Sequence, residues 1–429
     1  MLGASFFLTL SAAGRGSPQG PAEPSASAAP GRAPSAEYRL SPERRAKAIA
    51  YARARYRLHF AAFAWTLLVL AAIVRGKLGP RFRDLAERLS RRRFVQALVF
   101  VPLLLGTQAL LELPPGIYGH DLSRFYGQSV QGWGSWLWDA AKELLVAIAV
   151  AVPLAWLLYA VLRRSPRRWW LWFWLALLPI LVFLIFVAPL AIDPLFFRFD
   201  PLAPKHPELA HAIERVTANV GLPIPQDRMF EMNASAKYRS LNAYVTGLGA
   251  SKRVVVWDTT LAAMTVPQTL YVFGHEMGHY VLHHIPRTIA FLWALLFALL
   301  AAGAALLSRL LGRLGGRWGI RGLGDWASLP VLLLFLAIAS ELALPLVNAY
   351  SRSQEHAADV FGLEAIRGVV PNERRVAAEA FQVLGEVSLD DPEPSPFIRL
   401  WLYSHPPIAE RIRFVAGSES ATSPRPSPR

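Results

Sequence analysis

The chain of 429 residues contains no cysteine, which excludes disulfides, thiol nucleophiles and cysteine-bound zinc. It is also poor in charge: 17% of its residues are charged, against about 25% in a typical soluble domain. Hydrophobic residues make up 54% of the chain. The formal net charge is +15, but Lys and Arg form short clusters between apolar runs rather than one basic domain. We therefore expect a membrane protein with no nucleic-acid partner, in which His and carboxylates supply any metal ligands.

Six apolar segments are long enough to cross about 30 Å of hydrocarbon at about 1.5 Å per residue. The fourth opens with WWLWFW, which is typical of an aromatic belt at a membrane interface. The sequence therefore predicts a multi-pass membrane protein with these spans: Leu58 to Val74, Phe94 to Leu113, Leu144 to Leu162, Trp169 to Ile192, Ile289 to Leu307 and Leu329 to Val347.

The two ends of the chain lack a recognisable core. Residues 1–40 open with MLGASFFLTLSAAG and continue in a stretch rich in Pro, Ser, Ala and Gly. The apolar part is short for a span, so we expect this segment to be disordered, signal-like or at most a weak seventh span. Residues 417–429 are expected to be disordered.

Arginine-rich loops follow the first, third and fifth spans, which places them on the same side of the membrane. The positive-inside rule favours the cytoplasm for that side. The segment before the first span, SPERRAKAIAYARARYRLHF, is also basic and lies on the other side. The sequence alone therefore leaves the membrane orientation open.

The stretch GHEMGHY lies just before the fifth span. Residues four apart stack on one helix face, so His275 and His279 can hold one metal ion. Glu276 lies about 100° round the helix, where it could reach a metal-bound water and act as general base in hydrolysis. The pattern PQTLYVFGHEMGHYVLHH predicts a continuous helix from about Pro267 to His284. The alternative is a histidine pair that is ordinary surface polarity.

A third ligand must come from elsewhere, and NAYSRSQEHAADVFG after the sixth span is the best candidate. If this stretch continues as helix, Asn348, Arg352, Glu355 and Asp359 form one polar stripe. Glu355 would be the ligand, and Asp359 could orient a histidine through its second ring nitrogen. The alternative is a solvated face at a helix end.

Upstream of the histidines, RSLNAYVTGLGASKRVVVWDTT predicts a β-hairpin with strands near Leu241 to Thr246 and Arg253 to Trp257. A strand whose free edge faces the metal could bind a peptide in extended form. A hairpin that belongs only to the core is the alternative.

Together with IDPLFFRFDPL and SHPPIAERI, these motifs resemble the type I CAAX prenyl protease family of integral-membrane zinc endopeptidases. The resemblance implies that His275, His279 and Glu355 bind one zinc ion and that Glu276 is the general base. It further implies that His405 of the SHP motif stabilises the oxyanion. Four groups complete the implied site: Asp359 beside a ligand, Arg352 and Asn348 beside the ligand helix, and the substrate strand with Asn242, Ala243 and Tyr244.

The expected fold is a mainly α bundle of about six spans that encloses a chamber, with a small α+β metalloprotease domain. Membrane helices occupy residues 41–192 and 289–347, and the catalytic domain occupies residues 193–288 and 348–416. The expected function is hydrolysis of membrane-associated or CAAX-type protein substrates in contact with membrane lipid. A catalytically silent scaffold or transporter with the same fold is the alternative.

Two features depart from the eukaryotic members that the chain resembles. Those members have seven spans and a catalytic domain on the cytoplasmic side, opposite to what the Arg-rich loops indicate here. The composition also suggests a high-GC bacterial genome, and hence a bacterial cytoplasmic membrane. Proteolysis of a broader set of membrane proteins is then expected.

Overall fold

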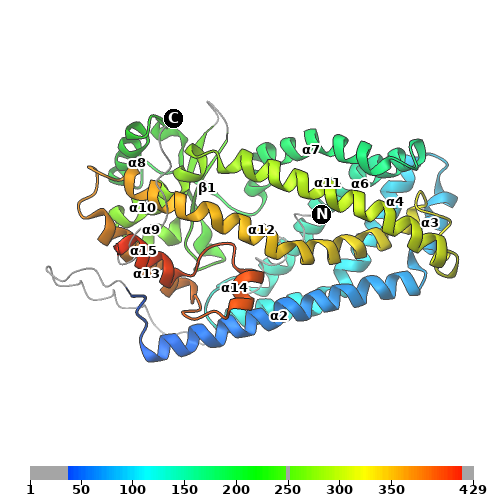
Figure 1. Cartoon of the computed structure of the whole chain (residues 1–429), viewed down its shortest axis with the longest axis horizontal. Helices are drawn as coiled ribbons and strands as arrows, with labels where there is room; N and C mark the ends of the chain where they lie inside the picture. The colour runs from blue at the N-terminus through cyan, green and yellow to red at the C-terminus, as the bar shows by residue number, and fades with distance from the viewer. Residues whose placement is uncertain (1–36, 248–251, 418–429) are drawn as a thin grey trace.

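The computed structural model describes residues 37–247 and 252–417. Figure 1 shows an elongated molecule in which long helices form one end and a smaller part with a β-sheet forms the other. The expectations for the N-terminal segment up to residue 36, for the hairpin turn at 248–251 and for the tail from 418 lie outside the described residues.

Within the described residues, five helices are long and apolar enough to cross a membrane. Their surfaces expose large leucines, such as Leu145 and Leu342, that suit contact with lipid better than with water. The fourth predicted span corresponds to α7 (Trp169–Ala191), whose described apolar part is Trp169–Phe183. The five helices are α2 (Pro42–Arg75), α4 (Arg93–Leu111), α6 (Trp133–Arg164), α11 (His284–Leu314) and α12 (Leu329–Ala365).

Two shorter helices join these spans at opposite ends of the bundle. Helix α3 (Leu78–Leu89) connects α2 to α4, and α5 (Leu113–Phe125) connects α4 to α6. In α3 the side chain of Arg83 is buried and pairs with Asp325 at 2.6 Å. Because a buried charge is costly unless paired, this contact ties α3 to the segment just before α12.

The β-sheet has four short strands in the order β1-β2-β4-β3. Strand β3 (Ala243–Thr246) pairs antiparallel with β4 (Arg253–Trp257), with Ala243 opposite Val256, and so confirms the predicted hairpin. Strand β2 (Met229–Met232) runs parallel to β4, and β1 (Phe199–Pro201) runs antiparallel to β2. This order leaves β3 at one edge of the sheet.

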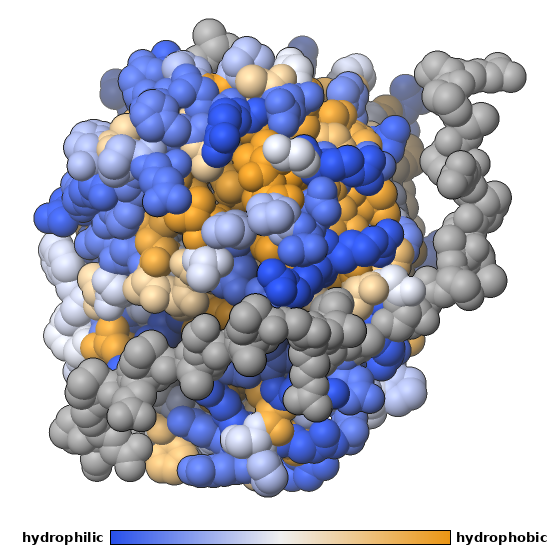
Figure 2. All heavy atoms as spheres, turned by 90° about the vertical axis from the view of Figure 1, so that its left-hand side faces the viewer, coloured by the Kyte–Doolittle hydropathy of each residue, from blue (hydrophilic) through white to orange (hydrophobic). Residues whose placement is uncertain are grey.

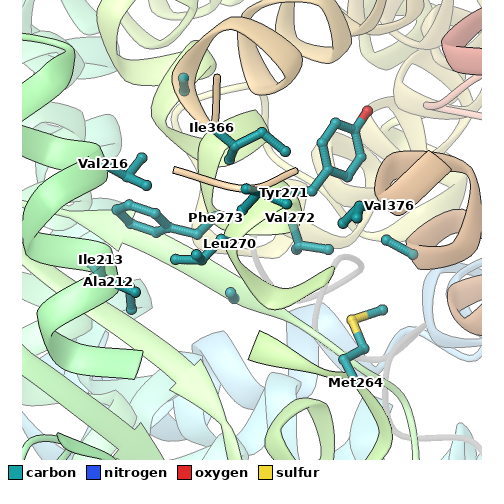
Figure 3. Close-up of a cluster of buried hydrophobic side chains, with 14 of the residues drawn as sticks. Ala212, Ile213, Val216, Met264, Leu270, Tyr271, Val272, Phe273, Ile366 and Val376 are labelled. Atoms are coloured by element: carbon teal, nitrogen blue, oxygen red, sulfur yellow. The ribbon is translucent and has the colours of Figure 1, made fainter. Parts of the chain in front are cut away.

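Helices pack around the sheet and form the second core of the molecule. Figure 3 draws part of this core, where Val216 of α8, Phe273 of α10 and Ile366 gather. Each large side chain that is fully buried there stabilises the fold by about 1.5–3 kcal/mol. The helices of this part are α8 (Pro207–Asn219), α9 (Asp258–Ala263), α10 (Val266–Val281), α13 (Glu373–Ser388), α14 (Pro396–Leu402) and α15 (Ile408–Ala416). Short 3₁₀ turns lie at Asp193–Leu195, Gln226–Arg228, Ala234–Ala236, Gly316–Trp318 and Trp326–Ser328.

The prediction of one continuous helix from Pro267 to His284 was wrong at its C-terminal end. Helix α10 ends at Val281, and α11 begins at His284. Between them His283 adopts a left-handed conformation with φ of 59°, which a helix cannot continue through. Histidine tolerates this conformation better than most residues. Pro286, in the first turn of α11, was the sequence signal of this break, since proline is tolerated at a helix start but not in a helix interior. The helix with the GHEMGHY motif is therefore separate from the following span.

Helices α10 and α12 approach each other closely through glycines. A Cβ atom on Gly362 would lie 3.1 Å from the backbone nitrogen of His275 and 3.1 Å from Cε2 of Tyr271. A Cβ on Gly274 would lie 3.1 Å from the carbonyl oxygen of Gly362. These distances leave no room for larger side chains, so the glycines permit the contact that brings His275 toward Glu355.

Replacement of Gly362 by Leu should force α10 and α12 apart. Overpacking of this kind costs about 1–3 kcal/mol, so the melting temperature in detergent should fall by several degrees. Gly312→Leu is the control, because Gly312 is exposed at the end of α11 and a Cβ there meets nothing within 4 Å. Equal melting temperatures for the two variants would show that the crossing does not depend on Gly362.

Candidate metal centre

Three predicted ligands from two helices converge on one point. His275 and His279 lie one turn apart on α10, and their Nε2 atoms are 3.2 Å apart. Glu355 of α12 places Oε2 3.5 Å from Nε2 of His275 and Oε1 3.5 Å from Nε2 of His279. The three side chains offer ligand atoms that all lie within 4.8 Å of one another.

This donor set fits a zinc ion. Two imidazole nitrogens and one carboxylate are a common three-ligand set for zinc sites that keep a fourth position open. The Oε2 atom of Glu355 is buried and accepts no hydrogen bond from the described residues. Nitrogens of His275 and Arg411 lie 3.5 and 3.6 Å from it without forming a hydrogen bond, and a cation at the meeting point of the three side chains would satisfy it.

A buried ion-pair network orients the ring of His275. Its Nδ1 lies 2.9 Å from Oδ1 of Asp359, and Arg411 of α15 contacts both oxygens of the same carboxylate at 2.6 and 3.1 Å. The Asp359 contact turns Nε2 of His275 toward Glu355. Burial alone would lower the pKa of His275, but its contacts with Asp359 and Glu355 outweigh burial and raise the pKa to about 9.

A different partner holds the ring of His279. Nδ1 of His279 lies 3.0 Å from Nδ1 of His284, the first residue of α11, and His284 is buried. Burial and the nearby His275 lower the pKa of His279 to about 4. The helix break at His283 therefore brings the start of the fifth span against the second histidine of the motif.

Glu276 lies on the same helix and is half-buried. None of the described residues donates a hydrogen bond to its carboxylate or pairs with it. Burial raises the pKa of Glu276 above its usual value. A carboxylate with a raised pKa and open oxygens is suited to accept a proton from a water beside the triad.

His405 reaches the triad from the loop between α14 and α15. Its Nε2 lies 3.4 Å from Oε1 of Glu355, and its Nδ1 lies 2.9 Å from the Ser404 hydroxyl. Just over half of the His405 side chain is exposed. The ring is thus beside the three ligands but open to a bound molecule.

Asn348 and Arg352 contact no member of the triad. The side-chain amide of Asn348 donates to the carbonyl of Trp401 at 2.6 Å. Arg352 donates to the carbonyl of Arg399 at 3.0 Å and to that of Tyr403. Both residues of α12 therefore hold the backbone that leads directly to His405.

The predicted substrate strand also lies in this part of the molecule. Asn242 is exposed, Ala243 is buried and Tyr244 is half-buried along the edge strand β3. Thr260 of α9 fixes the start of the strand, because its hydroxyl donates to the carbonyl of Asn242 and accepts from the Asn242 N–H, both at 2.8 Å.

Sequence reasoning missed three residues of this arrangement: His284, Thr260 and Arg411. His284 is the second histidine of VLHH, and sequence reasoning gave it no role. Arg411 lies in SHPPIAERI, where its signal was an arginine four residues after Pro407 on a short helix with an apolar face. None of the three has a spacing that points to the histidine motif, because each arrives from a separate element.

Family comparisons cover nearly all of the described chain. The family model described as peptidase family M48 matches residues 203–419, about half of the chain. The model described as the CAAX prenyl protease N-terminal region, with five membrane helices, matches residues 28–198.

Individual relatives agree with these matches. An uncharacterised metalloprotease of Bacillus subtilis, YhfN, is 32% identical over 77% of this chain and 75% of its own length. CAAX prenyl protease 1 of Saccharomyces cerevisiae is 29% identical over 42% of this chain and 40% of its own length. The Arabidopsis thaliana homolog of CAAX prenyl protease 1 is 26% identical over 89% of this chain and 90% of its own length.

The fold is also that of a solved structure. The crystal structure of Ste24p from S. mikatae superimposes with a TM-score of 0.75 over 88% of this chain and 90% of that one, at 23% sequence identity. At 23% identity the comparison shows a shared fold and nothing further.

Binding of a divalent metal ion should release about one proton at pH 7. His275 has a pKa of about 9 without metal and is protonated at pH 7, whereas His279, with a pKa of about 4, is already neutral. Since only the neutral ring can bind, apparent affinity should rise about tenfold per pH unit between about pH 6 and pH 8. Calorimetry in buffers of different ionisation enthalpy measures the release. In Asp359→Asn, which lacks the carboxylate that raises the pKa, the release should shrink; an unchanged release in that variant would contradict the assignment.

Loss of the buried guanidinium group of Arg411 should destabilise the protein when no metal is bound. Arg411→Met leaves the Asp359 and Glu355 carboxylates buried without their shared partner, at a cost of about 3–5 kcal/mol. Thermal unfolding in detergent with a chelator present measures the loss. Arg367→Met, at an exposed arginine just after α12, is the control and should melt close to the parent protein. Similar melting temperatures for both variants would rule out a stabilising network at Arg411.

Proposed function

The chain belongs to peptidase family M48 and to its CAAX prenyl protease family, and on this premise we propose that this integral-membrane metalloprotease is a zinc-dependent endopeptidase. The observation that carries the proposal is the convergence of His275, His279 and Glu355, with one buried oxygen of Glu355 left unsatisfied. These three residues would hold one zinc ion per chain.

A bound zinc ion would supply Lewis-acid chemistry, because it polarises a carbonyl oxygen and lowers the pKa of water. The chain's own residues orient the ligands and balance the buried charge. Asp359 and His284 orient the two histidine rings through the nitrogens that face away from the site. Arg411 keeps the Asp359 carboxylate in place and balances the buried negative charge.

Glu276 would be the general base of the reaction. Its open carboxylate takes a proton from the attacking water and delivers it to the leaving amine, and its raised pKa favours both transfers near neutral pH. His405 would donate a hydrogen bond to the oxyanion that develops on the attacked carbonyl. Asn348 and Arg352 hold the backbone on which His405 is carried.

The edge strand β3 would bind the substrate. A peptide in extended conformation can add to a free edge through main-chain hydrogen bonds, and the backbone of residues 242–246 offers this edge. Thr260 fixes the register of the strand at Asn242, so Asn242, Ala243 and Tyr244 would contact the residues on either side of the cleaved bond.

Membrane-associated or CAAX-type proteins are the proposed substrates. The relatives named CAAX prenyl protease 1 support the second class, and the membrane helices around the site support the first. We place the enzyme in a bacterial cytoplasmic membrane, where its partners are protein substrates and membrane lipid.

Glu276→Gln should abolish turnover while zinc stays bound. The amide keeps the size of the side chain but cannot take a proton, so hydrolysis of a reporter peptide in detergent or liposomes should fall by about 10²–10⁴. Zinc content measured on the same preparation should remain near one per chain.

Glu364→Gln is the matched control, because Glu364 is an exposed carboxylate on α12 that contacts neither histidine. It should hydrolyse the peptide at the parent rate. A Glu276→Gln enzyme that cleaves normally would overturn the role of Glu276, and parent protein that binds no zinc would overturn the metal assignment.

A further inference from the structure

The positive charge of the molecule is concentrated at one end of the helix bundle. Residues 75–93, 163–168 and 309–325 contain sixteen Lys and Arg residues and three Asp and Glu residues, which accounts for nearly all of the net charge of +15. Their contacts bring the three segments together: Arg321 pairs with Glu87 at 2.9 Å, and Arg163 lies beside Gly324. Figure 1 shows α3 and the end of α11 at this same end. We call these three segments the basic end.

Most of these cations face outward. All of them except Arg83 are exposed, and the three acids are already engaged in contacts within the basic end. The fold therefore does not neutralise the excess of positive charge. An exposed surface of this kind attracts anionic headgroups, at about 1 kcal/mol for each Lys or Arg near an anionic leaflet.

Exposed aromatic rings mark the membrane interface next to the basic end. Phe94 directly follows Arg93, and its ring meets that of Trp156 edge-on at 6.0 Å between centroids. Trp172, just after the Arg163–Arg168 stretch, is also exposed. Aromatic rings beside arginines are typical of side chains at the headgroup level of a bilayer.

The metal centre lies toward the opposite end of the helix bundle from the basic end. Helix α12 begins at Leu329 near the basic end and reaches Glu355 after about 39 Å, at about 1.5 Å per residue. This distance exceeds the roughly 30 Å of a hydrocarbon core. Figure 2 views the molecule from the end that holds the sheet and shows hydrophilic residues over most of that face, around an apolar area.

The short segments on the side of the metal centre contain fewer basic residues, with seven Lys and Arg in residues 37–57 against sixteen at the basic end. In the N-terminal part of α2, Arg44 pairs with Glu386 at 3.4 Å and Arg45 with Glu393 at 2.6 Å. The α4–α6 connection on this side, residues 112–132, contains two acids and one arginine. The positive-inside rule counts Lys and Arg rather than net charge, and the sixteen of the basic end outnumber the eight of these two segments.

We infer that the basic end lies against anionic headgroups of the cytoplasmic leaflet and that the metal centre faces the non-cytoplasmic side of the membrane. The positive-inside rule counts Lys and Arg in short connections, and all three connections of the basic end are short. Substrates would then be cut outside the cytoplasm. The inference rests on charge and geometry, so it stands or falls independently of the zinc chemistry.

The absence of cysteine makes the test direct, since one introduced thiol is the only one in the chain. Gly316→Cys places it at the basic end, where a side chain meets nothing within 4 Å, and Ala218→Cys places it on the exposed side of α8. Each variant is expressed in a Gram-negative bacterial host and exposed to a membrane-impermeant maleimide in spheroplasts. We expect Ala218→Cys to react in intact spheroplasts and Gly316→Cys to react only after lysis.

Reaction of Gly316→Cys in intact spheroplasts, with Ala218→Cys protected until lysis, would overturn the inference, and equal reaction of both would do the same. A second variant tests whether the arginines of the basic end set the orientation. Replacement of Arg91, Arg92, Arg167 and Arg168 by Gln in the Gly316→Cys background should make a fraction of the thiol reactive in intact spheroplasts. No change in reactivity would show that these arginines do not set the orientation. Zinc content of all variants, measured alongside, separates this result from any effect on the metal centre.

Discussion

The arrangement depends first on the close crossing of α10 and α12. These helices carry the histidine pair and Glu355, which lie far apart in the sequence, and the contact between Gly274 and Gly362 allows their backbones to meet. Because α12 is also a membrane span, its position is fixed by the bundle as well as by the sheet domain. One continuous helix therefore links the lipid-embedded part to the site.

Buried charge is the second constraint. His275, Glu355, Asp359 and Arg411 lie in one desolvated cluster, where each charge is tolerable only because another compensates it. The same contacts also orient the His275 ring, since Asp359 binds its Nδ1 and leaves Nε2 directed toward Glu355. Stability and readiness for a metal ion thus come from one set of interactions. Arg411 supplies positive charge that compensates the carboxylates of Asp359 and Glu355.

Polar contacts from α12 reach a third region, the segment around α14. Asn348 and Arg352 bind backbone carbonyls of this segment, and Glu341, deeper in the same helix, accepts from the Trp401 indole at 2.7 Å and contacts His59 of α2 at 3.0 Å. These polar residues lie within or beside an apolar span, where such groups usually pair with one another or face a cavity. Here they position the loop that carries His405. The histidine of that loop therefore depends on the membrane helices as much as on its own domain.

The sequence by itself determined the membrane helices, the hairpin and the residues of the histidine motif, because apolar length, alternation and helical periodicity are local properties of the chain. Helical spacing also pointed to Glu355 and Asp359, and motif resemblance added His405; the fold brings all three to one point. The break at His283 was not predicted, although Pro286 in the first turn of the next helix was a local signal for it. The sequence could not reveal the partnership of Arg411 with Asp359, that of His284 with His279, or the gathering of arginines from three connections at one end of the bundle. Those depend on contacts between segments distant along the chain, and only tertiary packing brings such segments together.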